Sequence, residues 1–154
     1  RAADPAPVLN SIIQLAELGV LLRSVTARDK AITATEYEYS PSVAEGPARY
    51  RQSLYNLARG HALVNGRHTL TEEDLALPLR IVLSTGPVER LRLLRHFIDG
   101  GIIKSTQQAG NVIGHAWNTA SIVLTQLLQL GLIRHGAEYY YLDEKYDWIK
   151  EIRV

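Results

Sequence analysis

Apolar and polar positions alternate with helical spacing most clearly between Ala116 and Leu130. Residues three and four positions apart are apolar there, which predicts an amphipathic helix with one buried stripe. The stripe comprises Ala116, Ala120, Val123, Leu124, Leu127 and Leu130. Its borders are Thr119 and Leu128, and the opposite face consists of Trp117, Asn118, Ser121, Ile122, Thr125 and Gln129. Gly131 follows the stripe, where helices commonly end in a left-handed residue.

The segments on either side of this helix predict a compact arrangement. Helical spacing also covers Val88–Ile98 and Lys104–Ile113, and Ser105 or Thr106 is expected to open the second of these helices. Gly114 provides the tight turn into the central helix. Two short strands are predicted downstream, over Leu132–Arg134 and Glu138–Leu142, with a tight turn at the three residues between them. Three helices followed by a hairpin is the order of elements in a winged helix.

Residues 88–142 therefore resemble a winged helix-turn-helix domain of the bacterial and archaeal regulator type. The strongest match is Asn118-Thr119-Ala120 at the start of the recognition helix, followed by Leu-x-x-Leu-x-x-Leu-Gly-Leu-Ile over residues 124–133. The resemblance implies a fold and a nucleic-acid-binding architecture. It does not imply a particular ligand, because this fold hosts many functions.

The N-terminal half begins with a helix predicted over Val8–Leu22, which is apolar nearly all round and should pack on more than one side. Ala31–Tyr39 alternates in the manner of a strand, and Leu21–Thr26 is its candidate partner. Tyr37 and Tyr39 could form a stacking platform for bases. Half-buried strand aromatics are the favoured interpretation of these two residues.

A second strong helix is predicted over Ala48–Val64 and ends at Asn65-Gly66. Thr71 to Asp74 resembles a capping box that starts another helix, which runs to about Leu83. Pro78 should kink or split that helix. The segment of residues 85–87, Thr-Gly-Pro, is the predicted linker to the winged helix.

Residues 47–83 are similar to the helical lid of AAA+ ATPases. The similarity rests on Pro47-x-Arg49, Leu57-Ala58-x-x-x-Ala62, Gly66-Arg67 and Leu70-Thr71-x-x-Asp74-Leu75. Minichromosome-maintenance and MoxR-type ATPases have such lids, and in the former a winged helix follows. The resemblance implies that Arg49 reaches the γ-phosphate of a bound nucleotide. The chain has no G-x-x-x-x-G-K-[ST] phosphate loop, so we expect it not to bind or hydrolyse ATP by itself.

These patterns together predict a mainly α protein with a small β component. Residues 1–85 form an AAA+ lid-like helical region with a short β element, and residues 86–154 form the winged helix-turn-helix domain. The chain begins with Arg1 and contains no Met. We therefore expect it to be the non-catalytic part of a larger protein, with any ATPase core upstream.

Charge and composition limit the candidate functions. The hydrophobic fraction of 46% is enough for a packed core, and the net charge is only +1. The chain contains nine Lys and Arg and nine Asp and Glu up to Thr85, and eight Lys and Arg and seven Asp and Glu after it. Neither half is basic, which argues against tight non-specific DNA binding. No apolar run approaches the roughly 20 residues of a membrane span and no signal peptide is visible, so a cytoplasmic location is expected.

The sequence shows no pattern of catalytic or metal-binding residues. It has no Cys, and its five His residues are scattered without metal-ligand spacing. His61 is expected to be a packed or surface histidine. The acidic residues Glu72, Glu73 and Asp74 fit a helix start better than acid–base catalysis. We expect no enzyme activity, no cofactor and no metal.

The exposed face of the recognition helix bears most directly on function. Asn118 and Gln129 carry amides that can read base edges, and Ser121 and Thr125 could contact bases or phosphates. Trp117 and Ile122 occupy positions where base-reading residues usually lie, although such a pair is also typical of a protein-binding patch. The candidate phosphate contacts are Arg90, Arg92, Arg95, Lys104, Arg134 and Lys145.

Two functions remain open at this point. The first is a DNA-binding module of a regulator or an AAA+-like ATPase, with double-stranded DNA as partner. The second is a protein-interaction or homodimerisation module on the same fold, with Trp117 and Ile122 buried in a partner. The amphipathic segment Asp143–Val154 forms a last helix or strand, and its Trp148 is expected to cover the core or a dimer partner.

Overall fold

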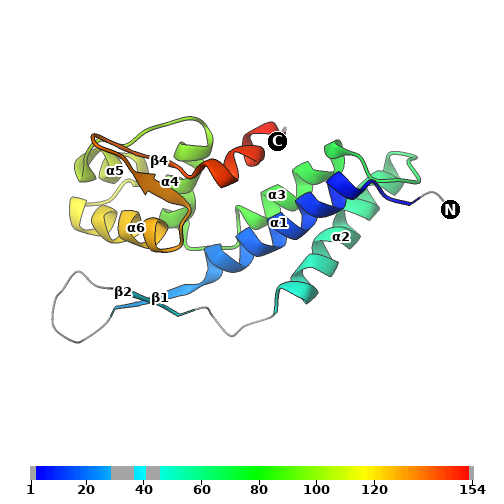
Figure 1. Cartoon of the computed structure of the whole chain (residues 1–154), viewed down its shortest axis with the longest axis horizontal. Coiled ribbons are helices and arrows are strands. Elements are labelled where there is room, and N and C mark those ends of the chain that lie inside the picture. The colour runs from blue at the N-terminus through cyan, green and yellow to red at the C-terminus, as the bar shows by residue number, and fades with distance from the viewer. Residues whose placement is uncertain (1–2, 29–36, 41–45, 153–154) are drawn as a thin grey trace. The chain divides into compact units, whose positions relative to one another are not determined.

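The computed structural model describes residues 3–28, 37–40 and 46–152. The chain is mainly α-helical and carries a small antiparallel two-stranded hairpin near its C-terminus (Figure 1). It divides into two compact units. The N-terminal unit contains residues 1–23, 42–86 and 152–154, and the C-terminal unit contains residues 24–41 and 87–151.

The N-terminal unit is a packed set of helices. Its elements are α1 (Ala6–Arg23), α2 (Pro47–Val64), the 3₁₀ turn η1 (Glu72–Leu75) and α3 (Ala76–Val82). The helix α1 packs against both α2 and α3. The contact between α1 and α2 is close at Gly19, where a Cβ atom would overlap with the Tyr50 ring. This close approach requires glycine in α1.

The first helix, α1, is 18 residues long with a mean hydropathy of 1.2. By length and composition it could cross a membrane, although the sequence pattern led us to expect no such segment. The core helix of a soluble protein meets the same criterion. The side chains of Ile12, Leu15 and Leu22 are almost completely buried in the structure, as those of a core helix are.

The helix predicted from Thr71 to about Leu83 is interrupted before Pro78 and not at it. The chain forms η1 first and then α3, in which Pro78 is the third residue. Proline is tolerated in the first turn because the N–H groups there have no partner within the helix. The predicted capping box is confirmed, since the Thr71 N–H donates to Asp74 Oδ2 at 2.8 Å.

The short β element differs from its predicted position. The strand β1 (Val25–Arg28) pairs antiparallel with β2 (Tyr37–Ser40), with Val25 opposite Ser40. The prediction that Leu21–Thr26 forms a strand is wrong for its first three residues, because they continue the apolar helix α1. The other predicted strand is Ala31–Tyr39, and its residues 31–36 lie outside the described residues. Contacts group β1 and β2 with the C-terminal unit, whereas the sequence had placed them in the N-terminal region.

The C-terminal unit packs three helices against a small hairpin. Its remaining elements are α4 (Val88–Ile98), α5 (Thr106–Ile113), α6 (Trp117–Gln129), β3 (Ile133–His135), β4 (Tyr140–Leu142) and the 3₁₀ helix η2 (Glu144–Glu151). The helix α5 packs on α6, and α4 contacts both. Leu93, Phe97, Ile113 and Leu127 are almost completely buried at the centre of this unit.

Backbone hydrogen bonds join the hairpin to the segment between α4 and α5. Its register places His135 opposite Tyr140, and the Gly136 N–H donates to the Tyr139 carbonyl at 2.9 Å. The turn therefore occupies residues 136–139, which corrects the predicted strand start at Glu138. The backbone of Ile103 exchanges two hydrogen bonds with Tyr140, of 3.2 and 2.7 Å. The segment between α4 and α5 is thus paired with the hairpin.

The C-terminal segment is helical rather than extended. It forms η2, which contacts α4 within the same unit. Ile149 is buried and Trp148 is half-buried. The expectation that Trp148 covers part of the core fits this partial burial, and its contact with a dimer partner stays a prediction.

Candidate nucleic-acid interface

The turn between α5 and α6 is fixed by two glycines. Gly114 has a φ of 74°, in the left-handed region, and the predicted tight turn at this glycine is confirmed. The N–H groups of Gly114 and His115 both donate to the carbonyl of Gly110, at 2.8 and 3.0 Å. A Cβ atom on Gly110 would lie 2.7 Å from the His115 carbonyl oxygen. Gly110 was not predicted to take part in this turn, although a glycine four residues before a helix-ending glycine is a usable signal for a close turn.

The start of α5 is capped by a side chain. The Gln108 N–H donates to the Ser105 hydroxyl oxygen at 3.2 Å, which satisfies one of the unpaired donors at a helix start. The predicted opening of this helix near Ser105 is therefore confirmed, while Lys104 lies before the helix. The N-cap of α6, Ala116, has no side chain that could do the same.

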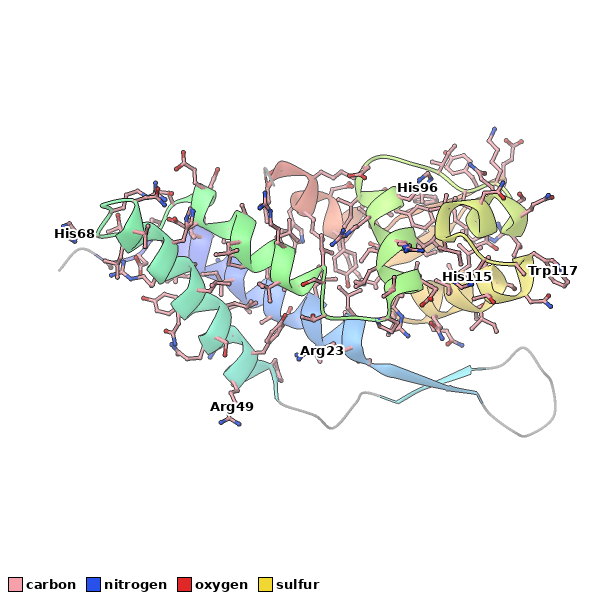
Figure 2. The ribbon with its side chains drawn as sticks, turned by 180° about the vertical axis from the view of Figure 1, so that it is seen from behind. Arg23, Arg49, His68, His96, His115 and Trp117 are labelled. Carbon is pink, nitrogen blue, oxygen red and sulfur yellow. The ribbon has the colours of Figure 1, made fainter. Side chains whose placement is uncertain are left out.

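The two faces of α6 are largely those predicted. Its buried residues are Ala120, Val123, Leu124 and Leu127. Ala116 is exposed, because it is the N-cap and precedes the first full turn. Trp117 is 65% exposed and projects from the surface at the start of the helix (Figure 2). Asn118 and Ile122 are also exposed, the latter to 38%.

Two half-buried polar residues of α6, Thr125 and Gln126, have hydrogen-bond partners inside the unit. The Thr125 hydroxyl donates to the Ser121 carbonyl at 2.9 Å, so its hydrogen is already used. Gln126 accepts a hydrogen bond from Arg90. Ser121 is half-buried on the border of the exposed face. Asn118 is therefore the most accessible amide on the exposed face of the helix.

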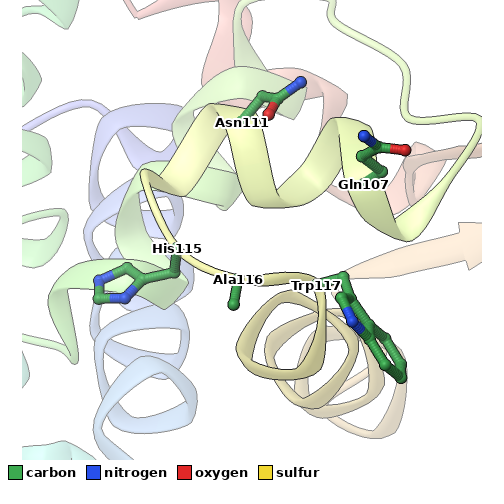
Figure 3. Close-up of a pocket in the computed structure, with 5 residues that line it drawn as sticks. All are labelled: Gln107, Asn111, His115, Ala116 and Trp117. Carbon is green, nitrogen blue, oxygen red and sulfur yellow. The ribbon is translucent and has the colours of Figure 1, made fainter.

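A shallow hollow of about 420 Å³ lies beside the start of α6. Gln107 and Asn111 of α5 line it together with His115, Ala116 and Trp117 (Figure 3). Two amides and an indole can hydrogen-bond and stack, and none of the three side chains is charged. The hollow can therefore accommodate a planar polar group such as a base edge.

The burial of Arg90 corrects its predicted role as a surface phosphate contact. Its side chain is 3% exposed, and its two terminal nitrogens donate to the Ser24 carbonyl at 2.9 Å and to Gln126 Oε1 at 3.1 Å. This burial lowers the pKa of Arg90. The guanidinium holds the segment after α1 against α4 and α6. It is not available to DNA in this conformation.

The other basic candidates lie closer to the surface. Lys104 is exposed just before α5. The Arg134 side chain is 64% exposed, and its Nε donates to Asp143 Oδ2 at 2.7 Å. That hydrogen bond raises the pKa of Arg134. Arg92 donates to the Ile113 carbonyl at 3.0 Å, which ties α4 to the end of α5.

The helix pair α5–α6 carries almost no charge. From Ser105 to Ile133 the sequence contains no Asp, Glu, Lys or Arg. His115 is the one titratable side chain in this stretch, and its Nε2 lies 3.4 Å from Glu89 Oε1. Recognition by this surface must therefore rely on hydrogen bonds, apolar contact and stacking rather than on ion pairs.

Comparison with known proteins adds no assignment. No protein-family model, no curated protein and no solved structure matches this chain. Function is therefore inferred from the residues and geometry of the chain itself.

In the N-terminal unit, the residue implied to contact nucleotide lies at the start of a helix. Arg49 is exposed and projects from the first turn of α2 (Figure 2). His61 lies near the other end of α2, where its Nδ1 is 2.7 Å from Asp74 Oδ1. Among the described residues, no group of three His, Asp or Glu side chains could hold a metal ion.

Proposed function

We propose that the C-terminal unit is a winged helix-turn-helix module that binds double-stranded DNA, with α6 as its recognition helix. The module would serve a larger cytoplasmic protein, either a regulator or an AAA+-like ATPase. The observation that carries the proposal is the α5–Gly114–α6 turn, which is followed by a hairpin paired to Ile103. In helix-turn-helix proteins the N-terminal residues of the second helix contact base edges.

The exposed residues at the start of α6 supply the base contacts in this proposal. Trp117, Asn118 and Ile122 face outward, and Ser121 lies at their border. Thr125 contributes through its methyl group and its oxygen, because its hydroxyl hydrogen is engaged within the helix. Lys104 and Arg134 supply the phosphate contacts. Arg90 is removed from the predicted set.

The test is an anisotropy titration of a labelled mixed-sequence duplex at about 50 mM salt, with sedimentation of the same sample. We expect the wild-type chain to bind this duplex, and we expect Asn118→Ala and Lys104→Ala to bind it more weakly. Lys150→Ala is the charge-matched control, because Lys150 pairs with Asp147 at 2.6 Å on η2. Absence of binding at low salt, or equal loss in all three variants, would contradict the proposal.

The second candidate function is protein interaction or homodimerisation through the same face. The exposure of Trp117 and Ile122 on an uncharged helix pair favours it, since aromatic residues often anchor protein interfaces. Under this alternative, Trp117→Ala abolishes self-association in sedimentation with little dependence on salt. Under the DNA-binding proposal the same substitution leaves the oligomeric state unchanged.

The N-terminal unit fits a supporting role in the same proposal. The resemblance to an AAA+ lid implies that Arg49 acts on a nucleotide held by an ATPase core. The exposed position of Arg49 at the first turn of α2 is compatible with contact to another domain. Titration of this chain with a fluorescent ATP analogue should show no binding.

A further inference from the structure

The exposed chemistry of α6 bears on which base pairs it can read. Guanine presents two acceptors in the major groove, O6 and N7, and Arg or Lys is the usual side chain that reads them. Adenine is read by the amide of Asn or Gln, and thymine presents a methyl group to apolar side chains. The residues of α5 and α6 include amides and apolar side chains but neither Arg nor Lys.

We propose that α6 reads A·T base pairs in preference to G·C base pairs. This inference rests on the proposed function, since it assumes that α6 enters the major groove. Asn118 is assigned to adenine N6 and N7, and Ile122 and Trp117 to the methyl groups of thymine.

The spacing of these side chains supports the assignment. Asn118 and Ile122 are four residues apart and both exposed, so they are neighbours on one ridge of α6. A rise of 1.5 Å per residue places their Cα atoms about 6 Å apart along the helix, close to the length of two base-pair steps. One amide and one branched aliphatic side chain can therefore meet two base pairs that lie two steps apart.

Three side chains that could donate to bases have hydrogen-bond partners within the C-terminal unit. Arg90 is buried with Gln126, and Thr125 gives its hydroxyl hydrogen to the Ser121 carbonyl. Arg134 is oriented by Asp143, which lies after the hairpin. The nearest exposed cation before α5 is Lys104, which precedes the helix that packs behind α6. The recognition surface thus has an adenine reader and methyl contacts, but no guanine reader on α6 itself.

The experiment compares four labelled duplexes of equal length in anisotropy titrations at one salt concentration. Two are A·T-rich and G·C-rich. The third replaces every thymine of the A·T-rich duplex with uracil, which removes the methyl groups. The fourth replaces adenine with 7-deazaadenine, which removes the N7 acceptor. Both replacements alter the major groove and leave the minor-groove acceptors in place.

We expect the A·T-rich duplex to bind roughly tenfold or more tightly than the G·C-rich duplex, the discrimination that one bidentate contact supplies. Uracil should weaken binding several-fold in the wild type and have no further effect in Ile122→Ala. The 7-deazaadenine effect should disappear in Asn118→Ala. Asn56→Ala, an exposed Asn substitution on α2, is the matched control and should retain both effects.

The outcomes separate this inference from the proposed function. Equal binding to the A·T-rich and G·C-rich duplexes, or preference for G·C, overturns the inference and leaves DNA binding intact. An A·T preference that survives both replacements reflects minor-groove shape, which also overturns reading by α6. Failure to bind any of the four duplexes overturns the proposed function itself.

Discussion

Asp74 shows at the residue scale how a buried carboxylate organises the N-terminal unit. Its side chain is fully buried, and it accepts hydrogen bonds from His61, from the Thr71 backbone and from the Arg67 guanidinium. Burial by itself raises the pKa of Asp74, but these hydrogen bonds outweigh burial and lower the pKa below its usual value of 3.8. The ionised form is therefore the one that stabilises the folded state.

The first prediction follows from the sign of this shift. A carboxyl group whose pKa is lowered by folding stabilises the protein above its unfolded pKa, and this contribution is lost as pH falls through the folded pKa. Asp74→Asn should lower the free energy of unfolding by about 1–3 kcal/mol at pH 7, because it removes charge-assisted hydrogen bonds. Urea unfolding followed by circular dichroism should show this difference shrinking below pH 3.8.

The control for this prediction is Glu73→Gln. Glu73 also pairs with Arg67, at 3.0 Å, but its side chain is 77% exposed. Exposed ion pairs contribute roughly 0–1 kcal/mol, so the control should change stability little at either pH. A loss in Asp74→Asn that is the same at pH 7 and pH 3 would show that the charge of Asp74 is not what stabilises the fold.

At the element scale, the local sequence pattern predicted the helices far better than it predicted the strand boundaries. The range Val88–Ile98 was predicted as it occurs in α4, and the buried stripe of α6 was predicted apart from Ala116. These features depend on spacing within one helix, which the sequence displays directly. The strand boundaries depend instead on pairing partners and turn hydrogen bonds, such as that between Gly136 and Tyr139.

The candidate site was predicted only in part, for a similar reason. The outward positions of Trp117, Asn118 and Ile122 follow from the helical period. The burial of Arg90 does not, because its partner Ser24 is 66 residues away in the sequence. The residues around an arginine on a helix do not show that a carbonyl far away in the sequence will accept its hydrogen bond.

The second prediction concerns the turn between α5 and α6. Gly110→Ala places a Cβ atom 2.7 Å from the His115 carbonyl oxygen, so the turn that leads into α6 must shift. We expect a loss of about 1–3 kcal/mol in unfolding free energy, as for other overpacked sites. Gly60→Ala on α2 is the matched control, because no atom lies within 4 Å of its added Cβ. That substitution should stabilise the protein by about 0.5–1 kcal/mol.

The readout is the urea midpoint of each variant at constant m-value. Gly110→Ala should also weaken duplex binding, since it displaces the start of α6. Equal stability of the wild type and Gly110→Ala would show that the α5–α6 turn accommodates a side chain, and the close packing inferred here would be wrong.

At the scale of the whole molecule, the small net charge limits how strongly the proposed DNA binding can depend on phosphate contacts. Residues 87–151 contain seven Lys and Arg against seven Asp and Glu. Each phosphate contact contributes about −0.9 to the slope of log K against log salt for duplex DNA. A module that grips two or three phosphates should therefore show a slope of roughly −2 to −3. Strongly basic modules make more phosphate contacts, and their slope of log K against log salt is much steeper.

The third prediction is the change in this slope. Between about 50 and 200 mM salt, affinity should fall roughly 10- to 40-fold for two or three phosphate contacts. Lys104→Ala should make the slope shallower by about 0.9, while Lys150→Ala should leave it unchanged. A slope unaffected by Lys104→Ala would place the phosphate contacts elsewhere on the molecule.

The most direct measurement uses tryptophan fluorescence, because the chain contains two Trp residues, Trp117 and Trp148. Trp117 lies exposed at the start of α6, and Trp148 is half-buried on η2. In Trp148→Phe the emission reports on Trp117 alone, and in Trp117→Phe it reports on Trp148. We predict that a saturating A·T-rich duplex quenches or shifts the emission of Trp117 and leaves that of Trp148 unchanged. Duplex binding that leaves the Trp117 emission unchanged would contradict the claim that α6 meets DNA.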